Sequence, residues 1–134
     1  GEHKAEAIKE EAAKIKKDRA DQSPEKSTEV IITGNGESLC YDVMSGRYFK
    51  TDIEKIRQVV NRINYRMMTE MYISLNEFYL ELGLKPIAGG DALGWNIERG
   101  LVEAVYSTQL TEDGQPCLVL DYQVQPDTGY SKLY

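Results

Sequence analysis

The stretch TDIEKIRQVVNRINYRMMTEMYISLNEFYLELGL (51–84) predicts two helices joined by a short link, and the rest of the fold is built around it. Thr51 and Glu54 have the spacing of a capping box, in which two side chains satisfy backbone N–H groups at the start of a helix. Apolar residues then recur at intervals of three and four, which is typical of a helix with one buried face. The residues of this stripe are Ile53, Ile56, Val60, Ile63 and Met67.

A second capping box opens the second helix. Ser74 and Glu77 supply its polar pair, and the helix continues through the apolar residues Phe78, Tyr79 and Leu82. Gly83 is expected to end it, because glycine takes the left-handed conformation of a helix C-terminus without steric cost.

Three short strands are expected before the first helix. Residues 30–33 are β-branched throughout, and the Gly-Asn-Gly sequence at 34–36 is typical of a hairpin turn. The return strand spans 39–43, and a second turn at 44–46 leads into a third strand at 47–50. We therefore expect an antiparallel meander.

Two segments of alternating polarity after the second helix predict a long hairpin with one buried face. The apolar positions are Val102, Ala104, Tyr106, Thr108 and Leu110 on one strand, and Leu118, Leu120, Tyr122 and Val124 on the other. Strands grouped on either side of a helical block predict an α+β fold, with two helices covering one face of an antiparallel sheet.

A charged segment precedes this domain. Residues 1–29 predict a helical arm or linker, and residues 30–134 the α+β domain. Within the arm, Ala5, Ile8, Ala12 and Ile15 repeat at the spacing of a short helix seam. No segment reaches the about 20 apolar residues of a membrane span. The start at Gly1, without methionine, raises the expectation of a trimmed N-terminus that carried a membrane anchor.

The composition argues against several classes of function. The chain has 22 acidic and 16 basic residues, for a net charge of −6, so nucleic acid is not expected as a partner. The only histidine is His3, in the arm, so neither a zinc site nor a Ser–His or Cys–His pair can form within the domain. Cys40 and Cys117 are expected to be small buried residues, with a disulfide between them left open. No cofactor or metal is predicted.

The loop at 86–98 offers the most distinctive chemistry. A ligand or partner would meet Trp95 as a stacking surface and Asp91, Asn96 and Glu98 as polar contacts. The alternative places Trp95 in the core, with its indole N–H bonded to a loop carbonyl.

An enzymatic alternative rests on acidic residues near the same loop. A small hydrolase would bring two of Asp91, Glu98, Glu103 and Asp121 together in one cleft. The tail at 127–134 carries two tyrosines, and it is expected to dock on this chain or on another.

Several blocks of the chain resemble a family of small uncharacterised proteins encoded by phages and prophages of gut bacteria. They are CYDVMSGRYFKTDIEKIR (40–57), MTEMYISLNEFYLELGL (68–84), GW (94–95) and LTEDGQPCLVLDY (110–122). The resemblance implies a membrane segment, then a charged helical stretch, then this small domain. It implies no activity and no catalytic residues.

These observations favour a non-catalytic interaction module over an enzyme. The expected partner is a protein or a second copy of the chain. The contact surface would be the open face of the sheet, an exposed edge strand or the Trp95 loop. A structural component of the virion is a third interpretation.

Overall fold

The computed structural model describes residues 30–33 and 38–132. The predicted arm at 1–29, with its seam of Ala5, Ile8, Ala12 and Ile15, lies outside the described residues.

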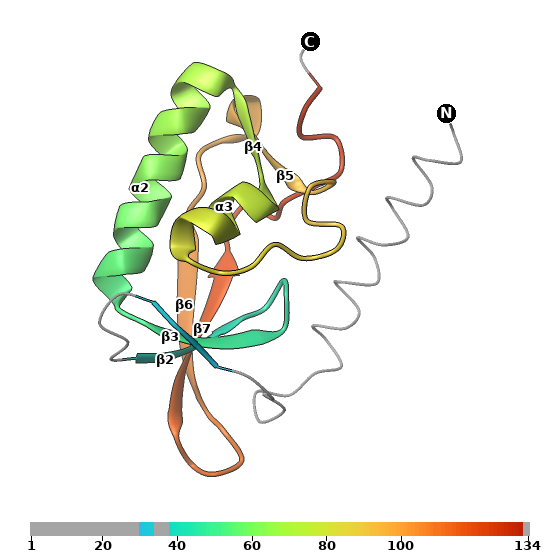
Figure 1. Cartoon of the computed structure of the whole chain (residues 1–134). Helices are drawn as coiled ribbons and strands as arrows, with labels where there is room; N and C mark the ends of the chain where they lie inside the picture. The colour runs from blue at the N-terminus through green and yellow to red at the C-terminus, as the bar shows by residue number, and fades with distance from the viewer. Residues whose placement is uncertain (1–29, 34–37, 133–134) are drawn as a thin grey trace.

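The described chain has an α+β fold with two helices and two open sheets, which confirms the predicted class (Figure 1). The larger sheet contains β1 (Ile31–Ile32), β2 (Ser38–Asp42), β3 (Arg47–Thr51), β6 (Ala104–Leu110) and β7 (Pro116–Tyr122). The smaller sheet pairs β4 (Tyr72–Ser74) with β5 (Gly94–Asn96). The helices are α2 (Ile53–Glu70) and α3 (Leu75–Leu82), and a 3-10 turn, η1, spans Ile97–Arg99.

The apolar stripe of α2 packs on the core as predicted, but its first residue does not. Ile56, Val59, Val60, Ile63 and Met67 are buried, whereas Ile53 is exposed. The capping box expected at the start of the helix was wrong. Thr51 remains in β3, where its hydroxyl accepts a 2.7 Å hydrogen bond from Thr33, and Asp52 takes the N-cap position without a side-chain cap.

The capping box of α3 is confirmed. The Ser74 hydroxyl accepts from the Glu77 N–H at 3.1 Å, and the Ser74 N–H donates to the Glu77 carboxylate at 2.8 Å. Gly83 ends the helix with φ of 94°, in the left-handed region that glycine tolerates. The next N–H, that of Leu84, returns to the carbonyl of Tyr79 at 2.8 Å.

The larger sheet is mixed, with the order β1-β3-β2-β7-β6, so the expected antiparallel meander was wrong. β2 pairs antiparallel with β3 on one side and parallel with β7 on the other, through Cys40 opposite Leu118. Because both edges of β2 are occupied, β1 pairs with the outer edge of β3 instead. That pairing is parallel, with Ile31 opposite Phe49.

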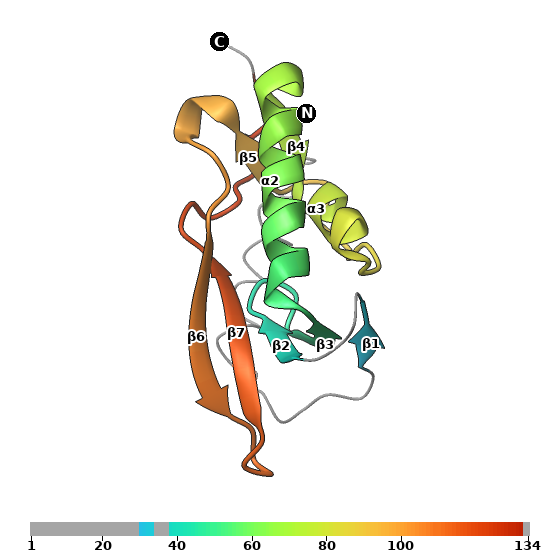
Figure 2. The ribbon, with the colours of Figure 1, turned by 90° about the vertical axis from the view of Figure 1, so that its left-hand side faces the viewer.

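The C-terminal hairpin is confirmed, with seven antiparallel pairs from Ala104–Tyr122 to Leu110–Pro116. Its buried face, however, belongs mainly to β7, and on β6 only Ala104 packs against the core. Leu120 and Tyr122 are buried, whereas Tyr106 and Leu110 on β6 are 37% and 67% exposed. The end of the hairpin extends past β2 and β3, away from the helices (Figures 1 and 2). Six of the seven side chains of β6 are exposed.

Both faces of the larger sheet carry buried side chains. Cys40 belongs to the main core, which includes the inner faces of α2 and α3, whereas Cys117 belongs to a second cluster with Tyr41, Tyr48 and Val119. Alternate residues of a strand point to opposite faces, so the two thiols lie on opposite sides of the sheet. Both cysteines are free, and burial raises the pKa of Cys40 to about 12.

The side chain of Asp42, at the end of β2, has no exposed surface and joins three elements of the domain. It accepts hydrogen bonds from Tyr79 of α3 at 2.6 Å, from Tyr122 of β7, and from the hydroxyl and N–H of Ser45 at 2.6 and 3.0 Å. Burial and the adjacent Asp42 carboxylate raise the pKa of Tyr79 and of Tyr122 well above the usual value, so both hydroxyls remain donors. The Arg47 guanidinium lies 4.7 Å from the centre of the Tyr79 ring and donates to Ser45.

The substitution Tyr122→Phe removes one donor to this carboxylate and leaves the ring in place. We expect it to lower the free energy of unfolding by about 1.5–3 kcal/mol, the range for a hydrogen bond to a charged group. Tyr106→Phe on the neighbouring strand is the matched control, because Tyr106 is 37% exposed and is not among the donors to Asp42. Urea denaturation measures both, and equal losses in the two variants would show that the Asp42 network is not the cause.

Candidate functional site

Trp95 occupies the core rather than the surface of the 86–98 loop. Its side chain is 2% exposed, and its ring centre lies 5.9 Å from that of Phe78 and 5.5 Å from that of Tyr122. The indole N–H donates to the carbonyl of Val124 at 2.7 Å. This is the second of the two predicted positions, and it leaves no open ring face for a ligand to stack on.

Asn96, the next residue of β5, uses its buried amide to hold the C-terminal tail. Its Nδ2 donates to the carbonyls of Tyr130 and Lys132 at 2.8 and 3.1 Å. Its Oδ1 accepts from the N–H of Glu98 at 3.0 Å, which caps η1. The amide that was predicted to contact a ligand therefore contacts this chain itself.

The other predicted contacts of the loop also have partners within the chain or face solvent. Asp91 accepts from the Asn76 amide at 3.1 Å, and its backbone carbonyl accepts from the Tyr130 hydroxyl at 2.6 Å. Glu98 is exposed. Gly94 and Asp127 exchange two backbone hydrogen bonds, of 3.1 and 2.9 Å, so the tail continues the small sheet by one bridge.

The described part of the tail thus docks on its own domain, as one of the two predicted alternatives states. The Tyr130 ring packs edge-on against that of Tyr72 with centres 5.8 Å apart, and Asp127 forms an ion pair with Arg99. Gly94 permits this approach, since a Cβ at that position would lie 2.6 Å from the Tyr130 ring.

The four carboxylates of the hydrolase alternative have separate surroundings. Glu103 is exposed and lies opposite Gln123, whose N–H donates to its carbonyl at 2.9 Å. Asp121 lies opposite Val105, and it accepts from the Gln125 amide at 3.0 Å. Among the described residues, no group of three or more His, Cys, Asp or Glu side chains is placed to hold a metal ion.

The most deeply buried acidic residue of the described chain, Asp42, is not among the residues that the sequence analysis singled out. Asp42 is fully buried and accepts four hydrogen bonds. One local signal was available, because aspartate is favoured at the first position of a turn and Asp42 lies just before Ser45 and Gly46. The donors Tyr79 and Tyr122 lie 37 and 80 residues away, so no local pattern indicates them.

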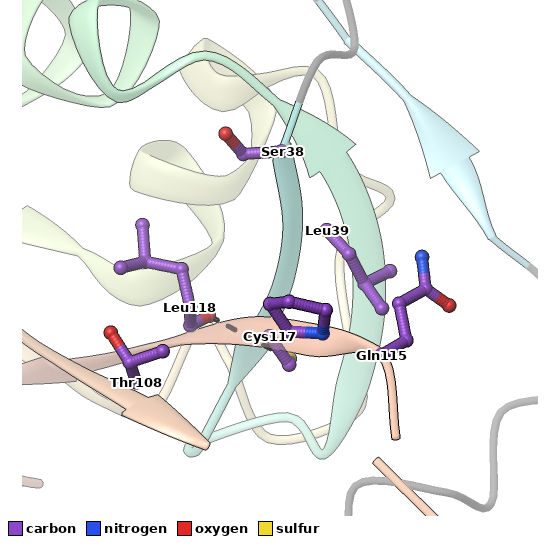
Figure 3. A pocket seen from close by; sticks show the side chains of 7 residues that line it. Ser38, Leu39, Thr108, Gln115, Cys117 and Leu118 are labelled. Carbon is purple, nitrogen blue, oxygen red and sulfur yellow. Dashed lines mark hydrogen bonds between the residues drawn. The ribbon is translucent and has the colours of Figure 1, made fainter. Parts of the chain in front are cut away.

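A hollow of about 350 Å³ opens where the parallel strands β2 and β7 diverge (Figure 3). None of the residues that line it is charged. They are Ser38, Leu39, Thr108, Gln115, Pro116, Cys117 and Leu118. The Cys117 thiol is buried, burial raises its pKa, and no residue of the lining is a base that would activate it.

One of the two outer strands of the larger sheet, β6, is the most exposed element that the structure describes. We define the β6 edge as the residues of that strand, Ala104–Leu110 (AVYSTQL). Six of its seven side chains are exposed, and none of the seven is charged. Among the described residues β6 pairs with β7 alone, so every second N–H and C=O of the strand points outward from the sheet.

The substitution Asn96→Ala removes both side-chain donors to the tail and the cap of η1. We expect chymotrypsin to cleave after Tyr130 at least several-fold faster, because the peptide around that residue would detach from β5. Mass spectrometry of the digest measures the rate, and Asn61→Ala on the exposed face of α2 is the control. Unchanged cleavage in Asn96→Ala would mean that the amide does not hold the tail.

Comparison with other proteins adds a family but no activity. No curated protein and no solved structure matches the chain. No helix among the described residues is long and apolar enough to cross a membrane. One family model, described as a family of unknown function (DUF6353), matches residues 1–131, and the chain therefore belongs to the DUF6353 family.

Proposed function

We propose that this chain is a non-catalytic interaction module that binds a protein through the β6 edge. The observation that carries the proposal is the mismatch between the pattern of β6 and its exposure. Its alternation of Ala104, Tyr106, Thr108 and Leu110 is that of a strand with one buried face, yet only Ala104 packs on the core.

An open strand edge binds an added strand through the main chain. The outward N–H and C=O groups supply the affinity, and the side chains on the two faces supply the specificity. Proteins usually protect such an edge with charged residues, proline or a short strand, because it otherwise pairs with other chains. β6 has seven residues and none of these protections.

The other two predicted contact surfaces are less accessible to a partner. The sheet face opposite the helices carries the buried cluster of Tyr41, Tyr48, Cys117 and Val119. In the 86–98 loop, the tail occupies the Asn96 amide and the backbone carbonyl of Asp91, both through Tyr130, and the Asp91 carboxylate accepts from Asn76. The β6 edge is the one predicted type of surface that the described structure leaves accessible.

The family resemblance described above also suggests which segments precede the domain. In the phage and prophage proteins that the chain resembles, a membrane segment and a charged helical stretch precede the domain, and we propose the same layout here. A single family model spans both residues 1–29 and the domain, which supports their action as one unit.

Site-specific photo-crosslinking tests the proposed surface. With p-benzoyl-phenylalanine in place of Tyr106, we expect covalent adducts to form in lysate of the host bacterium or in concentrated protein. The matched control replaces Tyr65, which is 72% exposed on α2 against 37% for Tyr106. Adduct masses from gels and mass spectrometry separate a foreign protein from a second copy.

The comparison between the two positions decides the outcome. Adducts that form at Tyr106 and much less at the more exposed Tyr65 support the β6 edge. Equal labelling at both positions, or none at Tyr106, contradicts it, because a bound strand would lie beside Tyr106.

A further inference from the structure

We infer that the occupant of the β6 edge is a second copy of this chain, paired antiparallel about a two-fold axis at Ser107. This inference rests on the proposed function, and it names the partner. A continuous sheet would then cross both copies, with β6 against β6 at its centre.

The register follows from the geometry of antiparallel pairing. Residues that lie opposite each other must both direct their N–H and C=O groups toward the partner or both away from it. A strand paired with its own copy therefore has a residue, not a peptide bond, on the two-fold axis. Ser107 is the midpoint of Ala104–Leu110, so only this centre pairs all seven residues. Such a pairing makes about six to eight main-chain hydrogen bonds.

The side chains of β6 are complementary to themselves in this register. Ala104 faces Leu110 of the copy, Val105 faces Gln109, and Tyr106 faces Thr108. Each larger residue thus meets a smaller or more slender one, and the Tyr–Thr pair joins an aromatic with a β-branched residue, a favourable combination across strands. The axis itself passes between two small serines.

The charges of the domain also favour this pairing. The chain carries a net charge of −6, so two copies repel each other over most approaches. The β6 edge has no charge, and the acids that flank it do not meet in the proposed register. Glu103 would face Thr111, and Glu112 would lie at the level of Val102.

Charge reversal on the axis gives the sharpest test, because a residue there faces itself. Ser107→Lys and Ser107→Glu each place like charges directly opposite, and we expect the dimer dissociation constant to rise on the order of tenfold or more in each variant. An equimolar mixture of the two variants pairs Lys with Glu, and it is expected to recover the dimer. The measurement is light scattering after size-exclusion chromatography over a concentration series. Ser131→Lys and Ser131→Glu, at an exposed serine in the tail, match the charge changes.

A cysteine variant provides a second measurement that does not depend on charge. Two Cys side chains from Ser107→Cys would meet on the axis, so oxidation is expected to give a covalent dimer at least tenfold faster than Ser131→Cys does. Cys40 and Cys117 are buried and do not compete. Thermal melting followed by circular dichroism confirms that each variant is folded.

The possible outcomes separate this inference from the function on which it rests. A dimer weakened in each charge variant and recovered in the mixture supports pairing about Ser107. A wild-type monomer at all concentrations, or a dimer that is indifferent to both charges, overturns it. If Tyr106 then crosslinks to a foreign protein, the interaction function stands with another partner. If Tyr106 forms no adduct, the function fails as well.

Discussion

The fold depends on one carboxylate without exposed surface, that of Asp42. Burial of a charge costs several kcal/mol unless hydrogen bonds replace its hydration. Asp42 gains four of them, from Ser45 beside it and from Tyr79 and Tyr122 far along the chain. These bonds fix β2 against α3 and β7, so the parallel β2–β7 pair takes the centre of the sheet. As a consequence β6 is left as the outer strand on the β7 side of the sheet.

Local patterns predicted much of this architecture. Three predicted features arise from residues close in sequence and were confirmed: the stripe of α2 except for Ile53, the capping box and glycine stop of α3, and the pairing of the β6–β7 hairpin. The sheet order was not predicted, because β2 pairs with β7, more than 70 residues away, and the periodicity of a strand does not indicate its distant partner. Thr51 matched the helix-cap pattern but stays in its strand, since the hydrogen bond to Thr33 competes with capping.

Burial separates the residues that maintain the structure from those available to a partner. Trp95 and Asn96 carry chemistry typical of ligand sites, yet both serve the domain itself: one fills the core and the other holds the tail. The sequence pattern singled out both residues, but it did not indicate that the C-terminal tail binds the Asn96 amide. For β6 the prediction was wrong in the opposite sense, because residues expected to be buried are exposed. Its alternation predicted a buried face, whereas Tyr106 and Leu110 are 37% and 67% exposed. The end of the hairpin extends beyond the helices (Figure 2).

In the proposed dimer the outward backbone groups of β6 bond to the β6 strand of a second copy. Amide hydrogen exchange at dilute and at concentrated protein tests this pairing most directly. Amides of β6 that bond to β7 should exchange slowly at both concentrations. Those that point outward should exchange quickly when dilute and slowly when concentrated, at alternate positions along Ala104–Leu110. Outward amides that exchange equally fast at both concentrations would contradict self-pairing at this edge.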